Sequence, residues 1–185
     1  MLLDSLKHYS WYNEPSNVRF VEEGMLVETM PQTDFWQAAH RGFRKDDGHF
    51  FYTEKLGNFE MLLNWHFSAA VSSDQCGLMV RADSRNWAKI GFLSPDMTVP
   101  QIGCVVTADG FSDWSSHGLP EAGCDYWFRV IRRGGDFLFF YSADGVKYHQ
   151  CRLFHLEKAA SDVKAGAYCC SPQNHRFECI LQNIE

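Results

Sequence analysis

The sequence predicts an all-β protein built as an antiparallel sandwich of two sheets, and three observations support this fold class. Short runs of alternating apolar and polar residues recur along the chain, separated by turn residues such as Gly, Asp and Asn. Aromatic residues make up 15% of the chain and favour pleated, half-buried surfaces. Helical periodicity is confined to residues 156–162 (LEKAASD). We expect about eleven to thirteen short strands and no fixed repeat, which favours a sandwich over a propeller.

Length and charge restrict the class of protein further. The 185 residues are expected to form one domain spanning residues 1–185, with 45% hydrophobic residues available for its core. The 17 basic and 23 acidic residues are spread along the chain without a basic stripe, which argues against a nucleic-acid partner. No stretch approaches the ~18 apolar residues of a membrane span, and Asp4 and Lys7 interrupt the N-terminus. We therefore expect a cytoplasmic protein with no membrane partner.

The cysteines and histidines predict neither disulfides nor a metal site. Seven cysteines at irregular spacing, in a chain with no export signal, are expected to be free thiols. Eight histidines are scattered, and no CxxC, HExxH or HxxxH pair supplies the spacing that a tetrahedral zinc site normally uses. The sequence therefore predicts no metal and no cofactor.

The first third of the chain is expected to supply strands and one polar–aromatic cluster. The expected strands are a hairpin over residues 18–29 that turns at 22–24, then 49–52 and 58–67. The cluster at residues 33–36 (TDFW) has two interpretations. Either Asp34 caps a turn while Phe35 and Trp36 enter the core, or Trp36 forms a platform for a sugar ring beside a carboxylate.

The centre of the chain is a predicted hairpin over residues 74–92. Two alternating runs flank the turn residues 82–86 (ADSRN). Antiparallel pairing would bring Arg81, Trp87 and Lys89 close together at the turn end. Whether all three share a face depends on the register, which the sequence leaves open.

The remainder continues as strands. The expected strands are residues 101–108, 125–133, 136–142, 146–153, 163–170 and 177–184. Gly134-Gly135 is a hairpin turn of the type that needs positive φ, and residues 94–97 (SPDM) are another expected turn. Residues 111–116 (FSDWSS) form a second polar–aromatic cluster.

Several short segments together resemble the uncharacterised concanavalin A-like domain family of unknown function that is related by name to a regulation-of-enolase protein. They are residues 33–36 (TDFW), 74–81 (DQCGLMVR), 87–91 (WAKIG), 105–107 (VVT), 112–115 (SDWS), 128–132 (FRVIR), 141–145 (YSADG) and 166–172. Each motif is weak alone, but their order and spacing over residues 11–182 are specific.

The resemblance implies a lectin/glucanase-type jelly roll with two sheets of six or seven strands, one of them concave, and it allows a homodimer. The family usually carries an acidic residue just after the KxG strand, where this chain has Phe92-Leu93. The architecture itself implies no reaction, since it hosts glucanases, lectins and structural modules.

We expect a non-catalytic domain that binds a carbohydrate or a small polar ligand on the concave sheet. Aromatic platforms and convergent polar groups characterise such a site. The candidate platforms are Trp36, Trp87 and Trp114, and the candidate polar contacts are Asp74, Gln75, Arg81, Lys89, Asp113 and Arg129. The competing interpretation is that the tryptophans belong to the core and that Asp74 and Arg81 form a structural ion pair.

Two other functions stay open. The resemblance suggests a protein-interaction or regulatory module acting on a metabolic enzyme. A glycoside hydrolase needs two carboxylates, and the ExDxE spacing common in glucanases of this fold is missing. The carboxylates that the fold would have to bring together for hydrolysis are Asp34, Glu60, Asp74 and Asp113. We expect no catalytic residues.

Overall fold

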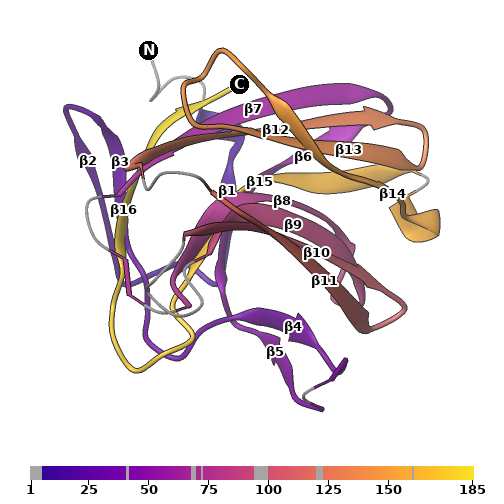
Figure 1. Ribbon diagram of the computed structural model, residues 1–185, viewed down its shortest axis with the longest axis horizontal. Coiled ribbons are helices and arrows are strands. Elements are labelled where there is room, and N and C mark those ends of the chain that lie inside the picture. The colour runs from indigo at the N-terminus through magenta and orange to yellow at the C-terminus, as the bar shows by residue number, and fades with distance from the viewer. Residues whose placement is uncertain are drawn as a thin grey trace.

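Two antiparallel sheets of seven strands each form the protein, as the computed structural model shows for residues 6–40, 42–67, 70–71, 73–93, 100–119, 123–159 and 161–185 (Figure 1). A third, two-stranded sheet pairs with neither of them. Within these residues the helical content is two 3₁₀ turns, η1 (Leu6–His8) and η2 (Glu157–Ala159). The prediction of an all-β antiparallel two-sheet sandwich is therefore confirmed.

The front sheet carries the centre of the chain, in the order β1-β6-β15-β8-β9-β10-β11. Its strands are β1 (Ser10–Tyr12), β6 (His49–Leu56), β15 (Asp162–Cys170), β8 (Gln75–Asp83), β9 (Asn86–Leu93), β10 (Gln101–Ala108) and β11 (Phe111–Gly118). The hairpin expected over residues 74–92 is the β8–β9 pair in its middle.

The back sheet has the order β14-β13-β12-β7-β16-β3-β2. Its strands are β14 (His149–His155), β13 (Asp136–Ser142), β12 (Asp125–Arg133), β7 (Phe59–His66), β16 (Glu178–Ile184), β3 (Gly24–Glu28) and β2 (Asn17–Val21). The expected turns at residues 22–24 and at Gly134-Gly135 join β2 to β3 and β12 to β13.

The main core fills the space between the two sheets. Strand alternation sends Met61, Leu63 and Trp65 of β7 inward to meet Leu78 and Val80 of β8, and all five are fully or almost fully buried. Burying each such side chain contributes roughly 1.5–3 kcal/mol to folding. The indole N–H of Trp65 donates to the carbonyl of Gly77 at 2.9 Å. This hydrogen bond connects the two sheets and satisfies a buried donor.

A second, smaller core lies on the other side of the front sheet, beneath the hairpin of β4 (Phe35–Gln37) and β5 (Arg44–Asp46). Figure 1 shows β8–β11 arching over this hairpin, away from β7, β12 and β13. Phe35 packs edge-on against Trp87 and Tyr168, with ring centroids 6.1 and 6.4 Å apart. Gly91 allows this packing, because a Cβ there would lie 2.4 Å from the Tyr168 hydroxyl.

The helical fragment expected over residues 156–162 is only the short turn η2, and Asp162 already begins β15. A few residues cannot sustain a helix when packing favours a strand, because helix nucleation is costly. The turn expected at residues 94–97 lies outside the described residues. No helix in the described ranges is long and apolar enough to cross a membrane.

Candidate functional site

A pocket of about 420 Å³ opens on the outer face of the front sheet, beside the β4–β5 hairpin. Its described lining comes from the hairpin region (Asp34, Trp36, Ala39, His40, Phe43), from β8–β11 (Gln75, Lys89, Leu93, Val105, Ser112, Trp114) and from two flanking loops (Ser73, Pro172). The volume lies within the roughly 300–1,000 Å³ of typical small-ligand sites.

Strand register decides which side chains reach the pocket. Arg81 pairs with Trp87 and Met79 pairs with Lys89, so Arg81, Trp87 and Lys89 share the outer face of the front sheet. Lys89 pairs in turn with Val105, and Val105 pairs with Trp114. The question that the sequence left open is thus answered: all three predicted residues lie on one face, and this row leads to Trp114 at the edge strand.

Lys89 sits at the floor of the pocket, where it is 3% exposed. Its Nζ donates to Gln75 Oε1 at 2.9 Å and to Asp34 Oδ1 at 3.2 Å. The rings of Phe35, Trp87 and Tyr168 surround the ammonium, with centroids 5.3–5.9 Å away. Opposite charge and aromatic faces together offset the cost of burying a cation.

The walls of the pocket are aromatic. Trp36 is half-buried, its Nε1–H donates to the Ala39 carbonyl at 3.0 Å, and its ring lies 6.5 Å from that of Phe43. Trp114 is 45% exposed on β11. Phe35 therefore belongs to the core, as the first interpretation of residues 33–36 expects, while Trp36 and Asp34 line the pocket. The role of Trp36 as a sugar platform stays a prediction.

The hairpin that forms one wall is fastened to the edge strand. The backbone N–H of Gln37 donates to Ser112 Oγ at 2.9 Å, and Thr107 supports that hydroxyl at 2.8 Å. Arg44 donates to the Gly110 carbonyl at 2.9 Å. These contacts hold Trp36 at a defined place over the sheet.

Arg81 was predicted as a ligand contact, and the structure instead gives it a structural partner. Its Nη1 and Nη2 donate to the two carboxylate oxygens of Asp46 at 2.7 and 2.8 Å, a bidentate geometry. The Tyr12 ring covers the guanidinium at 4.6 Å, and the Tyr12 hydroxyl also donates to Asp46. Burial and the hydrogen bond to Asp46 raise the pKa of Tyr12. Arg81 therefore latches the hairpin to the sheet and does not line the pocket.

Asp74 also has structural partners, but its partner is not Arg81, as the competing interpretation had it. Its carboxylate accepts from the Ser171 hydroxyl, from the backbone N–H of Val71 and from His175 Nε2 at 2.7 Å. Ser171 and Asp74 both contact the same ring nitrogen of His175, whereas a catalytic triad uses opposite nitrogens. This cluster holds the loops that carry Ser73 and Pro172 at the rim of the pocket.

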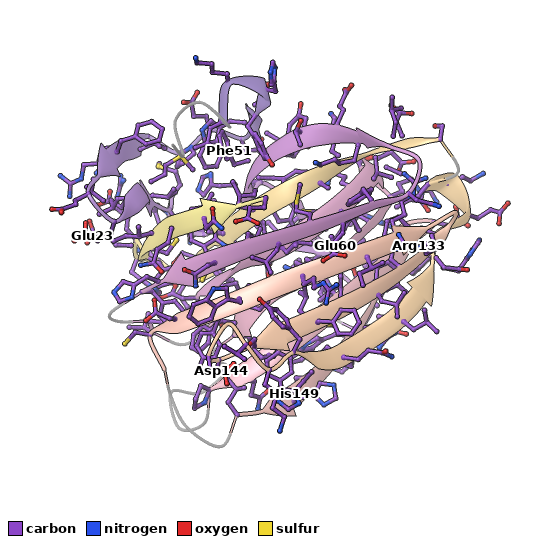
Figure 2. The ribbon with its side chains drawn as sticks, turned by 90° about the horizontal axis from the view of Figure 1, so that it is seen from above. Glu23, Phe51, Glu60, Arg133, Asp144 and His149 are labelled. Carbon is purple, nitrogen blue, oxygen red and sulfur yellow. The ribbon has the colours of Figure 1, made fainter. Side chains whose placement is uncertain are left out.

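The other predicted contacts lie outside the pocket. Trp87 is completely buried beneath Phe35 and cannot serve as an open platform. Asp113 alternates with Trp114 onto the other face of β11 and pairs with Arg152 at 3.1 Å. Arg129 lies on the back sheet, where it pairs with Glu60 at 2.7 Å; Figure 2 shows Glu60 on the outer face of that sheet. Strand alternation alone could not assign Arg129 to the back sheet.

Gln75, Lys89, Trp36 and Trp114 are the predicted residues that the structure brings together. Sequence reasoning considered Asp34 as a turn cap, as the carboxylate beside a Trp36 platform or as a carboxylate for hydrolysis, but did not count it among the ligand contacts. It missed the hairpin residues Ala39, His40 and Phe43. Their position depends on the hairpin folding back over the sheet, for which no local pattern is a signal.

The sheet order, the hollow front face and the covering hairpin define a concanavalin A-like β-sandwich. Residues 11–185 match the family described as "Protein of unknown function (DUF1349)", and the chain belongs to this family. "Regulation of enolase protein 1" of Saccharomyces cerevisiae is similar, with 31% identity over 169 residues that cover 91% of this chain and 83% of the relative.

Solved structures show the same architecture. A functionally unknown protein from Saccharomyces cerevisiae matches with a TM-score of 0.90 at 28% identity, covering 97% of this chain and 96% of that one. The Bacteroides ovatus "Xyloglucan PUL GH43B" protein matches with 0.74 at 14% identity, covering 97% of this chain but 36% of that one. A legume lectin-like domain from Entamoeba histolytica matches with 0.63 at 8% identity, covering 99% and 91%. The last two likenesses show the fold alone.

Proposed function

We propose that this chain is a non-catalytic binding domain whose front-face pocket takes a carbohydrate or another small, neutral, polar ligand. The observation that carries this proposal is the group formed by Asp34, Lys89 and Gln75 between two indole walls. Convergent polar groups on the floor of an otherwise apolar hollow are typical of ligand sites.

The charges of the pocket favour a neutral ligand. Lys89 and Asp34 are the charged residues in its described lining, and they offset each other. An ammonium has three N–H donors, and in the described chain Asp34 and Gln75 accept two of them. A ligand hydroxyl is expected to accept the third, while the faces of Trp36 and Trp114 contact the apolar side of a sugar ring.

The same lining argues against hydrolysis. Glycoside hydrolases typically need two carboxylates within about 10 Å of each other across the scissile bond. Asp34 is the one carboxylate among the described residues of the pocket, and its Oδ1 is bound to Lys89. Leu93 adds an apolar side chain where Phe92-Leu93 replaces the acidic residue usual in the family.

The test is a screen of neutral and acidic oligosaccharides on a glycan array, followed by calorimetry with the neutral hits. Trp114→Ala should weaken binding by about tenfold or more, because it removes one aromatic face. Trp127→Ala is the matched control, since Trp127 is half-buried on the back sheet and should leave binding unchanged. Equal binding by wild type and Trp114→Ala would contradict the proposal.

A second candidate is a regulatory module that acts on a metabolic enzyme, and the name of the yeast relative favours it. Its test is a steady-state enolase assay with and without an excess of this chain. A change in enolase activity that persists in Trp114→Ala would favour a protein partner bound away from the pocket. A change abolished by that variant would connect the two functions.

A further inference from the structure

Two thiols from different sheets meet at the edge of the sandwich. Cys104 lies on β10 of the front sheet and Cys151 on β14, the edge strand of the back sheet, and their Sγ atoms are 3.2 Å apart. A disulfide has an S–S distance of about 2.05 Å, so the sulfurs would need to approach by only about 1 Å. Cys104 is fully buried, whereas Cys151 is partly exposed to solvent.

A β-bulge aims Cys151 at its partner. On β13, Phe139 pairs with Arg152 and the next residue, Phe140, pairs with Gln150, so Cys151 is the extra residue of β14. Bulges re-aim side chains that regular pairing would direct elsewhere. Cys151 therefore packs against the main core.

The surroundings distinguish the two sulfurs. The Cys104 thiol donates its hydrogen to Cys151 Sγ. This bond and the neighbouring Arg152 guanidinium lower the pKa of Cys151, while the hydrogen bond and burial raise that of Cys104. Arg152 is itself held toward the front sheet by Ser115 at 3.0 Å and by Asp113 at 3.1 Å.

We propose that Cys104 and Cys151 form a reversible disulfide site that is oxidised by a hydroperoxide. The Cys151 thiolate attacks the terminal peroxide oxygen, the O–O bond breaks, and the leaving oxygen is protonated to an alcohol or to water. Cys104 then attacks the Cys151 sulfenic sulfur, the S–O bond breaks, and the displaced hydroxide takes the Cys104 proton as water. Both thiols are oxidised, the peroxide is reduced, and a dithiol reductant reverses the step.

The other cysteines lack this combination of access and partner. Cys76, Cys169 and Cys179 are neighbours but are completely buried, and burial raises the pKa of each. Cys124 is exposed on the loop before β12. Only a bond between 104 and 151 would join β10 to β14 and clamp the two sheets at this edge.

The experiment uses the full chain with Cys124→Ser, which prevents disulfides between molecules. Treatment with a slight excess of hydrogen peroxide should remove the mass of two hydrogen atoms, and peptide mapping without reductant should recover a 104–151 cross-link. The melting temperature should rise by roughly 5–10 °C, because a loop of 47 residues is closed, and dithiothreitol should reverse the rise.

Variants test the assigned roles. In Cys104→Ser, dimedone should label Cys151 as a trapped sulfenic acid; if that variant does not fold, Cys104→Ala serves instead. Arg152→Gln should slow oxidation roughly three- to tenfold, whereas Asp113→Asn, which leaves Arg152 beside Cys151, should not slow it. Recovery of a different cysteine pair, or of only unlinked thiols and sulfinic acids, would overturn the proposal.

Discussion

Arg81 and Lys89 are two cations on the same face of the same strand pair, and each meets an aspartate of the β4–β5 region, yet their surroundings differ. Arg81 binds both oxygens of Asp46 beneath the Tyr12 ring. Lys89 makes one contact of 3.2 Å to Asp34 at the floor of an open pocket.

Under the proposed function, the Arg81 pair fastens the hairpin to the sheet, whereas the Lys89 pair contacts the ligand. A planar guanidinium matches a carboxylate with two donors, which leaves a sealed, rigid pair. An ammonium has three separate N–H donors; Lys89 uses two of them for Asp34 and Gln75, which leaves one donor that a ligand can use. The pair that is less completely satisfied by the protein is therefore the better candidate for binding.

The largest effect is expected from breaking the sealed pair. Arg81→Met should lower the free energy of unfolding by about 2–4 kcal/mol, because Asp46 remains partly buried without its partner. Urea denaturation measures this loss as a lower midpoint. Arg129→Met, on the exposed back-sheet pair, is the control and should cost less than about 1 kcal/mol. Equal losses in the two variants would remove the distinction between a latch and a surface pair.

A smaller loss of stability, with a larger loss of binding, is expected for Lys89→Met. Asp34 can hydrate through the pocket once its partner is gone, so the free energy of unfolding should fall by only about 1–2 kcal/mol. Binding of the glycan hits should fall at least about tenfold, as measured by calorimetry. Adding Asp34→Asn should restore part of the stability but not the binding. Wild-type affinity in Lys89→Met would refute the assignment of the pocket floor.

The smallest effect is expected in the pH dependence of the hydrogen bonds between His49 and the backbone of Met30 and Asn13. The Met30 backbone N–H donates to His49 Nε2 at 2.8 Å, so the neutral ring must carry its proton on Nδ1, 2.6 Å from the Asn13 carbonyl. Burial lowers the pKa of His49 below its ordinary value of 6.5. Between the lowered pKa and 6.5 the unfolded chain binds more protons than the folded chain. The contribution of His49 to the free energy of unfolding is therefore complete above pH 6.5 and declines as the pH falls.

His49→Gln isolates this contribution, because the amide keeps a donor and an acceptor but does not titrate. The difference in unfolding midpoint between wild type and variant should shrink as the pH falls from 7.5 to 5. His155, whose pKa is raised by Asp136 and Glu157, has the opposite sign but is present in both proteins and cancels. A constant difference across that range would show that His49 does not titrate as described.

Much of the fold was predictable because strand alternation and turn chemistry are local. The β8–β9 hairpin and the turn between β12 and β13 follow from their own residues. Four of the nine predicted contacts also line the pocket, namely Trp36, Gln75, Lys89 and Trp114. Arg129 was misplaced because a period of two distinguishes two faces of a strand but not which sheet the strand joins. Asp113 lies on the expected sheet but on its other face, because it is next to Trp114 on one strand.

The sequence by itself determined the all-β class, the family and the pairing of β8 with β9, since these depend on neighbours along the chain. Only the tertiary structure decided that Arg81 pairs with Asp46, that Asp74 is hydrogen-bonded to Ser171 and His175, and that Lys89 lines a pocket. Asp46 is 35 positions from Arg81, and Asp34 is 55 positions from Lys89. Ser171 and His175 are 97 and 101 positions from Asp74. The contacts of Arg81 and Lys89 arise from the folding of the hairpin region across the sheet, and those of Asp74 arise from the loop after β15. No local pattern encodes which buried charge finds which partner.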